Sequence, residues 1–242
     1  SAASDVYKRQ MKEACLKQEP LVEKEYSYIP QKSKTSFDLF EINSMNQKVD
    51  DSSCYVSEMF NSNQILEKSN ITSVDGFVNA HLGKGKIVDS LNVSNSYSVA
   101  AILEMGYESC VISDECDKYQ VEEIMKGFSN RYHFDAPVYK TLYQKRRLMT
   151  MKHCPVNTAL KDGKRMNCGL CHHHRYELEG LDGKRVFLFG DKDCHMRLYD
   201  VNIMNEIENR KDYESYGIKH FRFVFTDENQ EEVKTAFRAY NR

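Results

Sequence analysis

The sequence predicts an α/β fold, and two features of the chain support it. From residue 85 onward, short apolar runs typical of strands alternate with longer stretches whose apolar side chains recur at helical spacing. In addition, "MGYESCVISDE" (105–115) and "YGIKHFRFVFTDE" (216–228) share one pattern: a glycine, a strand, Ser/Thr-Asp-Glu and a helix. Strands that alternate with helices in this way form parallel βα units, in an open sheet or in a (β/α) barrel.

The first strands are expected between residues 35 and 90. The runs "SFDLFEI" (36–42) and "SCYVSEMF" (53–60) alternate apolar and polar residues, as half-buried strands do. A further short strand is expected in "GKIVDS" (85–90). Residues 11–34 are polar and aperiodic, so no element is assigned to them.

The middle of the chain predicts helix, strand and helix in turn. A first helix is expected over 96–106 with Gly106 as its terminator, then a strand over 107–113, then a second helix that stops at Gly127. Ser113 is expected to cap the second helix, and the acids that follow it complement the helix dipole. The apolar positions that define these two helices are Val99, Ile102, Leu103, Val121, Ile124 and Met125.

The last forty residues repeat this plan. Asp200 is expected to cap a helix that runs to Tyr216, where Gly217 ends it. A strand over 218–225 follows, and Thr226 opens the final helix. Between 151 and 200 the regular alternation breaks, and this segment holds half of the cysteines and most of the histidines.

Composition excludes several classes of protein. A chain of 242 residues can form a sizeable core, its net charge is −2, and no run approaches the roughly 20 apolar residues of a membrane span. The first residues lack the apolar core of a signal peptide. We therefore expect a cytoplasmic protein without a membrane partner, whose cysteines are free thiols or metal ligands.

Four cysteines form the most specific motif of the chain. Cys154, Cys168, Cys171 and Cys194 have the spacing C-x13-C-x2-C-x22-C, and Gly169 allows a tight turn between the middle pair. Four thiolates suit a tetrahedral zinc ion or a four-cysteine iron–sulfur cluster. The alternative is that these are scattered buried thiols.

Other interpretations of "CGLCHHH" (168–174) are weaker. C-x2-C-H is also the haem-attachment pattern, but that chemistry needs an exported protein, and a thioredoxin-like pair would follow a strand and begin a helix. His172, His173 and His174 cannot all face one ion, so they are expected around the site more than in it. His153 and His195 each adjoin a cysteine of the motif, which fits a role beside the site or simple packing.

Positive charge is concentrated in one part of this acidic chain. Between Lys140 and Arg185 there are eleven Lys and Arg against four Asp and Glu. Such a surface could face phosphate or RNA, and the interleaved Tyr139, Tyr143 and Tyr176 could stack on bases. Ordinary solvated loop charges explain the excess equally well.

Five segments, taken in order, resemble the collagenase-like peptidases of family 32, the peptidases of unknown catalytic type. The resemblance covers about residues 76–226, and its cysteine segments agree in order, spacing and flanking residues. It departs at "YQKRRLM" (143–149), where the family usually has a glycine and a single arginine. The five segments are "IVDSLNVSNSYS" (87–98), "MGYESCVISDE" (105–115), "RRLMTMKHCPVN" (146–157), "CGLCHHHRYELEGLDGKRVFLF" (168–189) and "DKDCHMRLYD" (191–200).

The resemblance implies a fold, a cofactor and two activities. The fold would be the later portion of a (β/α) TIM-type barrel with a cysteine-rich insertion, and the four cysteines would hold a [4Fe–4S] cluster, with zinc as the alternative metal. The family name implies a peptidase acting on peptides. Similar proteins instead hydroxylate RNA bases or quinone precursors without oxygen, so RNA or a small aromatic molecule is the alternative substrate.

This interpretation divides the chain into four parts. Residues 1–34 are unassigned, and 1–10 look like a cloning or sequencing remnant. Residues 35–150 form a partial barrel, 151–200 the cysteine-rich metal-binding segment, and 201–242 the final helix, strand and helix of the barrel. Because the chain does not begin with methionine, we expect it to lack an N-terminal region of a longer protein.

The barrel hypothesis also predicts where the chemistry lies. In such barrels the active site forms at the carboxyl ends of the strands. Asn92, Asn95, Glu115 and His153 each follow a predicted strand, so we expect them to gather there with the thiolates around one pocket. The two amides would orient a polar substrate and Glu115 would act as general acid or base, unless it only caps a helix.

Two classes of function remain open from the sequence. The first is an enzyme, either a peptidase or an iron–sulfur-dependent hydroxylase, although the sequence contains neither a serine or cysteine nucleophile arrangement nor an H-E-x-x-H zinc motif. The second is a non-enzymatic module in which zinc stabilises a domain that binds RNA or protein. Metal analysis of protein purified without oxygen separates the two.

Overall fold

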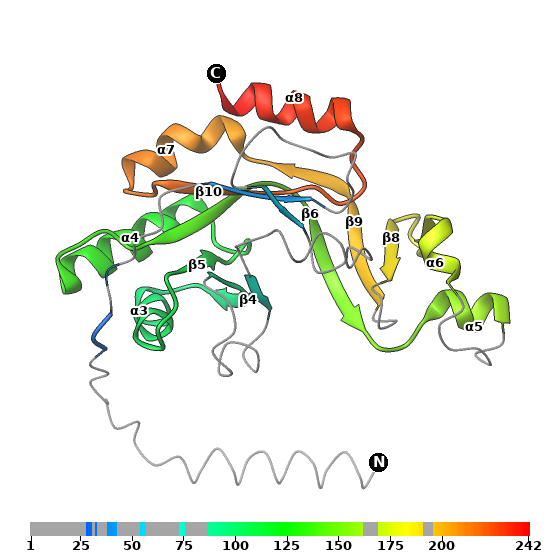
Figure 1. The fold of residues 1–242 in the computed structure, drawn as a ribbon, viewed down its shortest axis with the longest axis horizontal. Coiled ribbons are helices and arrows are strands. Elements are labelled where there is room, and N and C mark those ends of the chain that lie inside the picture. Colours follow the sequence, from blue (N-terminus) through cyan, green and yellow to red (C-terminus); the bar gives the residue numbers. More distant parts are fainter. Residues whose placement is uncertain are drawn as a thin grey trace, which may run out of the picture.

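The computed structural model describes residues 28–30, 32, 38–42, 54–56, 73–75, 87–161, 169–190 and 196–242. Within these ranges the chain is a mixed α/β structure built on one sheet of ten strands (Figure 1). Seven of these strands pair in parallel, and three add an antiparallel extension on one side. The α/β class predicted from the sequence is confirmed.

The parallel part of the sheet has the order β2-β1-β10-β6-β5-β4-β3. Parallel strands that are adjacent in the sheet also follow one another along the chain. The last parallel strand of the chain, β10, pairs with the first, β1. Among the described residues no pairing joins β2 to β3, so the sheet is open there. These strands are β1 (Leu39–Ile42), β2 (Cys54–Val56), β3 (Ser73–Asp75), β4 (Ile87–Val93), β5 (Ser109–Ile112), β6 (Val138–Met151) and β10 (His220–Val224).

The long strand β6 carries the chain out of the parallel sheet. Its first half pairs with β5 and β10, and its second half pairs antiparallel with β9 (Met196–Asn205). β9 pairs with β8 (Arg185–Gly190), which pairs with β7 (Tyr176–Glu179). Two short helices, α5 (Pro155–Lys161) and α6 (Leu170–His173), lie on this antiparallel extension, on the side of the molecule away from α3 and α4 (Figure 1).

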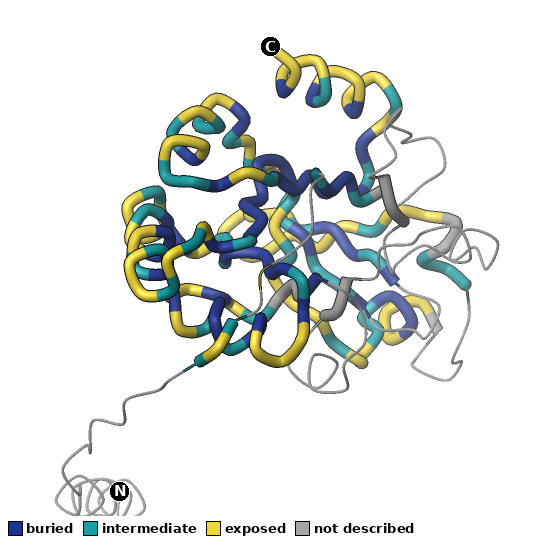
Figure 2. Tube along the Cα trace, turned by 60° about the vertical axis from the view of Figure 1, so that its left-hand side comes forward, coloured by how far each residue is buried: buried dark blue, intermediate teal, exposed yellow. Residues whose placement is uncertain are grey.

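The main core lies between the parallel strands and four helices. α3 (Ser96–Glu104), α4 (Lys118–Tyr132), α7 (Arg210–Ser215) and α8 (Gln230–Tyr240) turn buried faces toward the strands and exposed faces outward (Figure 2). Aromatic rings dominate it: Phe40 stacks on Phe223 at 5.0 Å, and Tyr240 of α8 packs edge-on against Phe223 at 4.9 Å. Burial of such rings is the main favourable contribution to folding in this region.

A second, smaller core lies on the opposite face of the parallel strands. It consists of Leu39, Ile87, Val111 and Tyr139, one residue from each of β1, β4, β5 and β6. Because side chains alternate along a strand, Leu39 points away from its neighbour Phe40, which lies in the main core. The parallel sheet therefore has apolar side chains on both faces, as parallel sheets usually do.

Most of the predicted elements are present. Each of the five predicted strands overlaps an observed one, although β4 extends past the predicted end at residue 90 to Val93. The helix predicted over 96–106 is α3, after which Gly106 takes a φ of +95°. The predicted stop at Gly127 is wrong, because α4 continues to Tyr132 and His133 follows in the left-handed conformation. Gly127 instead allows close packing, since a Cβ there would lie 3.2 Å from Ser96 Oγ.

The start at Asp200 of the helix predicted to run to Tyr216 is also wrong, whereas its end is confirmed, because Tyr216 is the C-cap of α7 and Gly217 follows with a φ of +99°. Residues up to Asn205 belong to β9, which pairs with β8 on one edge and β6 on the other, and α7 begins only at Arg210. The two predicted caps were misplaced as well, because Asp117 caps α4 and Asn229 caps α8, each within a capping box. No helix in the described part of the chain has the length and apolar character to span a membrane.

Candidate functional site

A pocket of about 550 Å³ opens at the carboxyl ends of the parallel strands. Five parallel strands contribute to it, because Glu41 and Asn92 are the next-to-last residues of β1 and β4, Ile112 ends β5, and β6 and β10 pass beside them. The antiparallel extension supplies the remaining wall. The lining residues are Glu41, Asn92, Val111, Ile112, Ser113, Asp114, Glu115, Gln144, Lys145, Arg146, Arg147, Leu148, Arg197, Tyr199, Arg222 and Val224.

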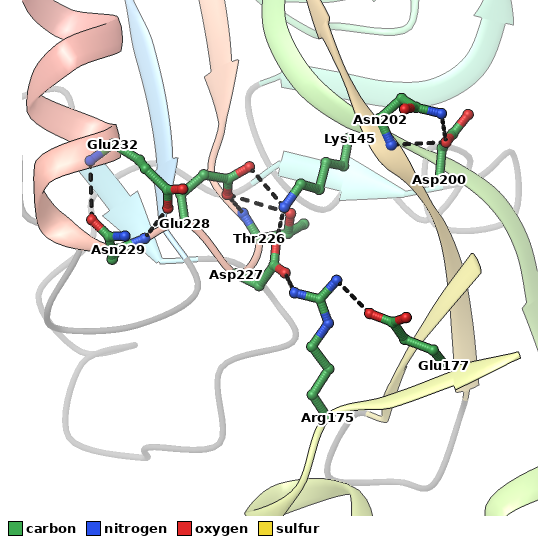
Figure 3. Close-up of polar contacts among 10 residues, drawn as sticks. All are labelled: Lys145, Arg175, Glu177, Asp200, Asn202, Thr226, Asp227, Glu228, Asn229 and Glu232. Atoms are coloured by element: carbon green, nitrogen blue, oxygen red, sulfur yellow. Dashed lines mark hydrogen bonds and ion pairs between the residues drawn. The ribbon is translucent and has the colours of Figure 1, made fainter. Parts of the chain in front are cut away.

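Cations outnumber anions in the lining of this pocket. Arg222 of β10 donates a hydrogen bond to Glu41 of β1 at 2.7 Å, so this cation and this carboxylate neutralise each other. Lys145 pairs with Asp227 and Glu228, which come from the turn after β10 (Figure 3). The lining contains five cations, Lys145, Arg146, Arg147, Arg197 and Arg222, against three carboxylates, Glu41, Asp114 and Glu115.

Asn92 and Glu115 both lie at the pocket. Asn92 has a φ of +50°, an uncommon conformation that asparagine tolerates better than most residues, and its Oδ1 accepts a hydrogen bond from the Ser113 hydroxyl. The same Ser113 oxygen accepts the backbone N–H of Glu115 at 3.2 Å. Ser113 therefore joins the ends of β4 and β5, and Glu115 is an exposed pocket residue that does not cap a helix.

Tyr199 forms the aromatic part of the wall. It is 5 % exposed, and its ring stacks on Phe187 of β8 at 5.2 Å with an interplanar angle of 18°. Burial raises the pKa of Tyr199 to about 12, while Arg197 beside it acts in the opposite direction. The Tyr199 phenol is thus protonated at neutral pH.

Asn95 and His153 lie outside the pocket lining. The Asn95 side chain accepts the Ser98 N–H at 2.9 Å as the N-cap of α3. His153 is exposed beside α5, with Nε2 at 3.4 Å from the Thr158 hydroxyl. The structure therefore brings together two of the four substrate residues expected from the sequence. His153 lies apart because β6 runs on to Met151, beyond the edge of the parallel sheet.

Two cysteines of the motif pack against one small apolar cluster. Cys154 and Cys171 both contact the group formed by Val156, Leu188 and Met196. Cys154 Sγ accepts the Asn157 N–H at 3.3 Å, at the first turn of α5. Cys168 and Cys194, together with His195, lie outside the described residues.

The space beside Cys171 depends on a glycine. A Cβ at Gly190 would lie 2.5 Å from Cys171 Sγ and 3.0 Å from Met196 Sδ, so a side chain there would displace the thiol. Gly190 pairs with Met196 across β8 and β9, at the end of the hairpin whose loop carries Cys194. Cys154 accepts a backbone N–H and Cys171 lies beside a bare glycine, and both are sulfur donors of the kind that zinc and iron–sulfur clusters use.

The pocket and the cysteines lie on opposite faces of the β8–β9 pair. Phe187 and Tyr199 occupy the face toward the pocket, whereas Leu188 and Met196 occupy the face toward Cys154 and Cys171. Alternation along a strand requires this separation. The expected gathering of thiolates and pocket residues around one cavity is therefore replaced by two sites that share one pair of strands.

The remaining described cysteines have a different environment. Cys110 and Cys116 are buried in the main core, where burial raises the pKa of Cys110 to about 12 and also raises that of Cys116. Such thiols are poor metal ligands.

His174, the last histidine of the triplet, is exposed, and its ring centroid lies 6.2 Å from that of Tyr176, edge to face.

Three residues of the pocket, Arg197, Tyr199 and Arg222, do not stand out in any sequence motif. Arg197 and Tyr199 lie in a stretch that was expected to surround the last cysteine, and Arg222 lies within a predicted strand. One signal was present for Arg222, because an arginine between two phenylalanines in "HFRFV" must face the side away from the aromatic core.

Comparison of the chain with protein-family models, curated proteins and solved structures finds no match.

Proposed function

We propose that this chain is the later part of a (β/α) barrel enzyme that holds a metal group on four cysteine thiolates. Two observations support a barrel. The parallel strands follow one another around the sheet in chain order, with β10 next to β1, and the pocket lies at their carboxyl ends. In (β/α) barrels this edge carries the active site.

The metal group would be held by Cys154, Cys168, Cys171 and Cys194. In the sequence, Cys168 directly precedes Gly169, and Cys194 comes two residues before Met196. Met196 pairs with Gly190, and a Cβ at Gly190 would meet both Cys171 Sγ and Met196 Sδ. Since one residue spans at most about 3.6 Å, the sequence places Cys168 and Cys194 within a few residues of Gly169 and Met196, and we propose that they complete the ligand set. Sulfur donors favour an iron–sulfur cluster or zinc, and we propose a [4Fe–4S] cluster, which when bound transfers single electrons.

Within this class we propose an enzyme of the collagenase-like peptidase type that modifies RNA without oxygen. The observation that carries the substrate is the pocket, whose lining holds five cations against three carboxylates among the described residues. Peptide cleavage has less support there. Among the described lining residues no histidine or cysteine occurs, and Ser113 donates its proton to the Asn92 amide.

The chain's own residues would then have distinct roles. Arg146, Arg147 and Arg197 would bind phosphate groups of the RNA backbone. Tyr199 would bind a base through its ring edge and its protonated hydroxyl, and Asn92 and Glu115 would contact polar groups of that base. The β8–β9 pair, with the Tyr199–Phe187 stack on its pocket face, lies between the pocket and the described cysteines Cys154 and Cys171.

Metal analysis tests the first half of this proposal. Protein purified without oxygen should be brown and contain about four iron atoms and labile sulfide per chain, since four cysteines hold one [4Fe–4S] cluster. A colourless protein with a single zinc ion would contradict the cluster and favour a zinc-stabilised binding module.

RNA binding tests the second half. A fluorescently labelled single-stranded RNA should bind, and Arg197→Ala should weaken binding and reduce its salt dependence by about one ion, because each lost phosphate contact releases one counterion fewer. Arg185→Ala is the matched control, since Arg185 is an exposed residue of β8 outside the pocket. Equal affinity of wild type and the Arg197 variant would contradict the assignment.

A further inference from the structure

The three carboxylates that line the pocket differ in their partners. Glu41 accepts a hydrogen bond from Arg222 at 2.7 Å, so its charge is compensated within the pocket. Asp114 accepts a hydrogen bond from the Gln144 amide, which also lines the pocket. Within the described part of the chain, no group donates to the carboxylate of Glu115, which is exposed. Glu115 is therefore the pocket carboxylate whose two oxygens are open to a ligand.

Asn92 presents a donor next to this acceptor. Its amide oxygen accepts the Ser113 hydroxyl, so its amide nitrogen remains as a donor, and no described residue accepts from that nitrogen. The same Ser113 oxygen accepts the Glu115 N–H at 3.2 Å, and the Ser113 N–H donates to the Val93 carbonyl at 2.9 Å. Three hydrogen bonds of one serine thus join the ends of β4 and β5 and hold Asn92 close to Glu115.

The backbone at Asn92 is unusual for a strand. Its φ of +50° lies in the left-handed region, which few residues other than glycine adopt without cost. The pairing of β4 with β5 also shifts register between Val88 and Val93, so β4 departs from regular pairing where Asn92 lies. Strained conformations and bulges of this kind concentrate at binding sites, where they turn one side chain in a direction that a regular strand does not allow.

The positive charge of the pocket comes from other elements than Asn92 and Glu115. Five consecutive residues of β6, 144–148, line the pocket, and three of them are basic. A regular strand turns only alternate residues to one side, but the register of β6 against β9 shifts on both sides of Arg147. A ligand with phosphate in one part and hydrogen-bonding groups in another matches this division, and a nucleotide has both.

We propose that Asn92 and Glu115 select guanine, so that the pocket binds a guanosine nucleotide of single-stranded RNA. This inference rests on the proposed function as an RNA-binding enzyme and names the base that the pocket takes. One amide donor beside two carboxylate oxygens is complementary to an edge with one acceptor followed by two donors. The Watson–Crick edge of guanine has this order, with O6 as the acceptor and N1–H and N2–H as the donors.

The other bases match this pair of side chains less well. Uracil offers O4 to the Asn92 amide and N3–H to Glu115, but its O2 would oppose the second carboxylate oxygen. Cytosine and adenine would turn an amino group toward the Asn92 amide, donor against donor. A site built to pair with polar groups rejects a ligand that leaves those groups unpaired. The expected order of affinity is guanine, then uracil, then adenine and cytosine.

The experiment compares five single-stranded RNA oligonucleotides that differ at one central position. That position carries guanosine, inosine, uridine, adenosine or cytidine, and abasic nucleotides on both sides supply phosphates without competing bases. Binding of each fluorescently labelled oligonucleotide to the full chain is measured by anisotropy at one salt concentration. We expect guanosine to bind about tenfold more tightly than adenosine or cytidine, the effect of one bidentate contact. Inosine, which lacks the amino group of guanosine, and uridine should lie between.

Two variants should change this order in different ways. Glu115→Gln replaces one carboxylate oxygen by an N–H donor, a pattern that suits uracil, so uridine should bind at least as tightly as guanosine. Asn92→Asp replaces the amide donor by an acceptor and still tolerates a positive φ, and it should weaken binding of guanosine and uridine but not of adenosine. Glu179→Gln is the matched control, because Glu179 is an exposed residue of β7 outside the pocket, and it should keep the wild-type order.

Two results would overturn this inference alone. One is equal affinity of the wild-type chain for all five oligonucleotides, and the other is an undiminished preference for guanosine in Glu115→Gln. A wild-type chain that binds none of the five would contradict the proposed RNA binding as well, so the two failures are distinguished within one experiment.

Discussion

At the scale of single residues, surroundings divide the cysteines into two kinds. Cys110 is enclosed by the main core, and burial raises the pKa of its thiol to about 12. Cys154 and Cys171 are partly exposed, and the first of them already accepts a backbone N–H. Donation to sulfur stabilises the thiolate that a metal requires, whereas burial without a partner destabilises it.

This difference predicts the outcome of serine substitutions. Cys171→Ser, and equally Cys168→Ser, should abolish metal binding, because each removes one of four thiolate ligands. Cys110→Ser and Cys116→Ser should keep the full metal content. Iron and zinc measured by plasma mass spectrometry on purified variants provide the check, and metal retained in Cys171→Ser would overturn the assignment.

Tyr199 predicts a pH dependence on the alkaline side. Its pKa of about 12 in the folded chain exceeds the ordinary value of 10.0, so between these values the native state keeps a proton that the unfolded chain releases. The contribution of Tyr199 to stability is therefore complete below pH 10 and lost as pH rises toward 12. In this range Tyr199 lowers the free energy of unfolding by at most about 1.4 kcal/mol per pH unit.

The Tyr199→Phe variant isolates this contribution. The free energy of unfolding, obtained from urea titrations between pH 9 and 11, should fall less steeply with pH in the variant than in wild type. Other buried tyrosines, such as Tyr143 and Tyr213, are present in both proteins, so their contributions cancel in the comparison. Identical slopes would show that Tyr199 titrates at an ordinary pKa.

At the scale of elements, the β8–β9 pair is the part that both sites share. One face carries Phe187 and Tyr199 and the other carries Leu188 and Met196, so a change on one face reaches the other through a single backbone layer. The pair ends at Gly190, where the cysteine face needs an open position. A hairpin of this kind can join two sites without bringing their ligands into contact.

Gly190→Ala tests the close packing at this end. The new methyl group would lie 2.5 Å from Cys171 Sγ, so the thiol must move, and overpacking of this kind costs about 1–3 kcal/mol. We expect lower stability in urea and weaker metal binding. Gly180→Ala is the matched control, because its methyl group would meet only the mobile end of exposed Asp182 at 2.7 Å, and it should have little effect on either measurement.

At the scale of the whole molecule, Asp38 joins the first described strand to the last elements of the chain. Its two oxygens accept the Phe221 N–H of β10 at 2.8 Å and the Tyr240 hydroxyl of α8 at 2.5 Å. Arg210 of α7 adds a hydrogen bond to the Tyr240 carbonyl at 2.8 Å. The two bonds of Asp38 connect residues about two hundred positions apart, and they fix β1 beside β10.

Asp38→Ala should therefore destabilise the whole fold. The variant leaves the Tyr240 hydroxyl and the Phe221 N–H without their partner, and we expect a loss of about 2–4 kcal/mol in the free energy of unfolding by urea. Asp182→Ala is the control, because Asp182 bonds only within its own turn, at 3.2 Å to the Lys184 N–H. A loss below 0.5 kcal/mol for Asp38→Ala, the range of ordinary surface changes, would mean that this junction contributes little.

Local patterns were sufficient for most elements and insufficient for their ends. The apolar spacing of α3 and the alternation of β10 follow from side chains within a few residues, so both were predicted. The end of α4 was not, because the role of Gly127 depends on Ser96 of another helix. Likewise, β9 gave a misleading helical pattern because its conformation is set by pairing with β6 and β8.

The sequence by itself determined the α/β class, five of the parallel strands and the helices that alternate with them, and the four cysteines as the candidate metal ligands, since periodicity and spacing are local properties. Only the tertiary structure decided that Asn92 and Glu115 share a pocket with Arg197 and Tyr199, and that Asn95 and His153 do not. It also placed Cys154 and Cys171 behind the β8–β9 pair. The physical reason is that register and strand length, set by pairing between distant segments, decide which face each side chain takes.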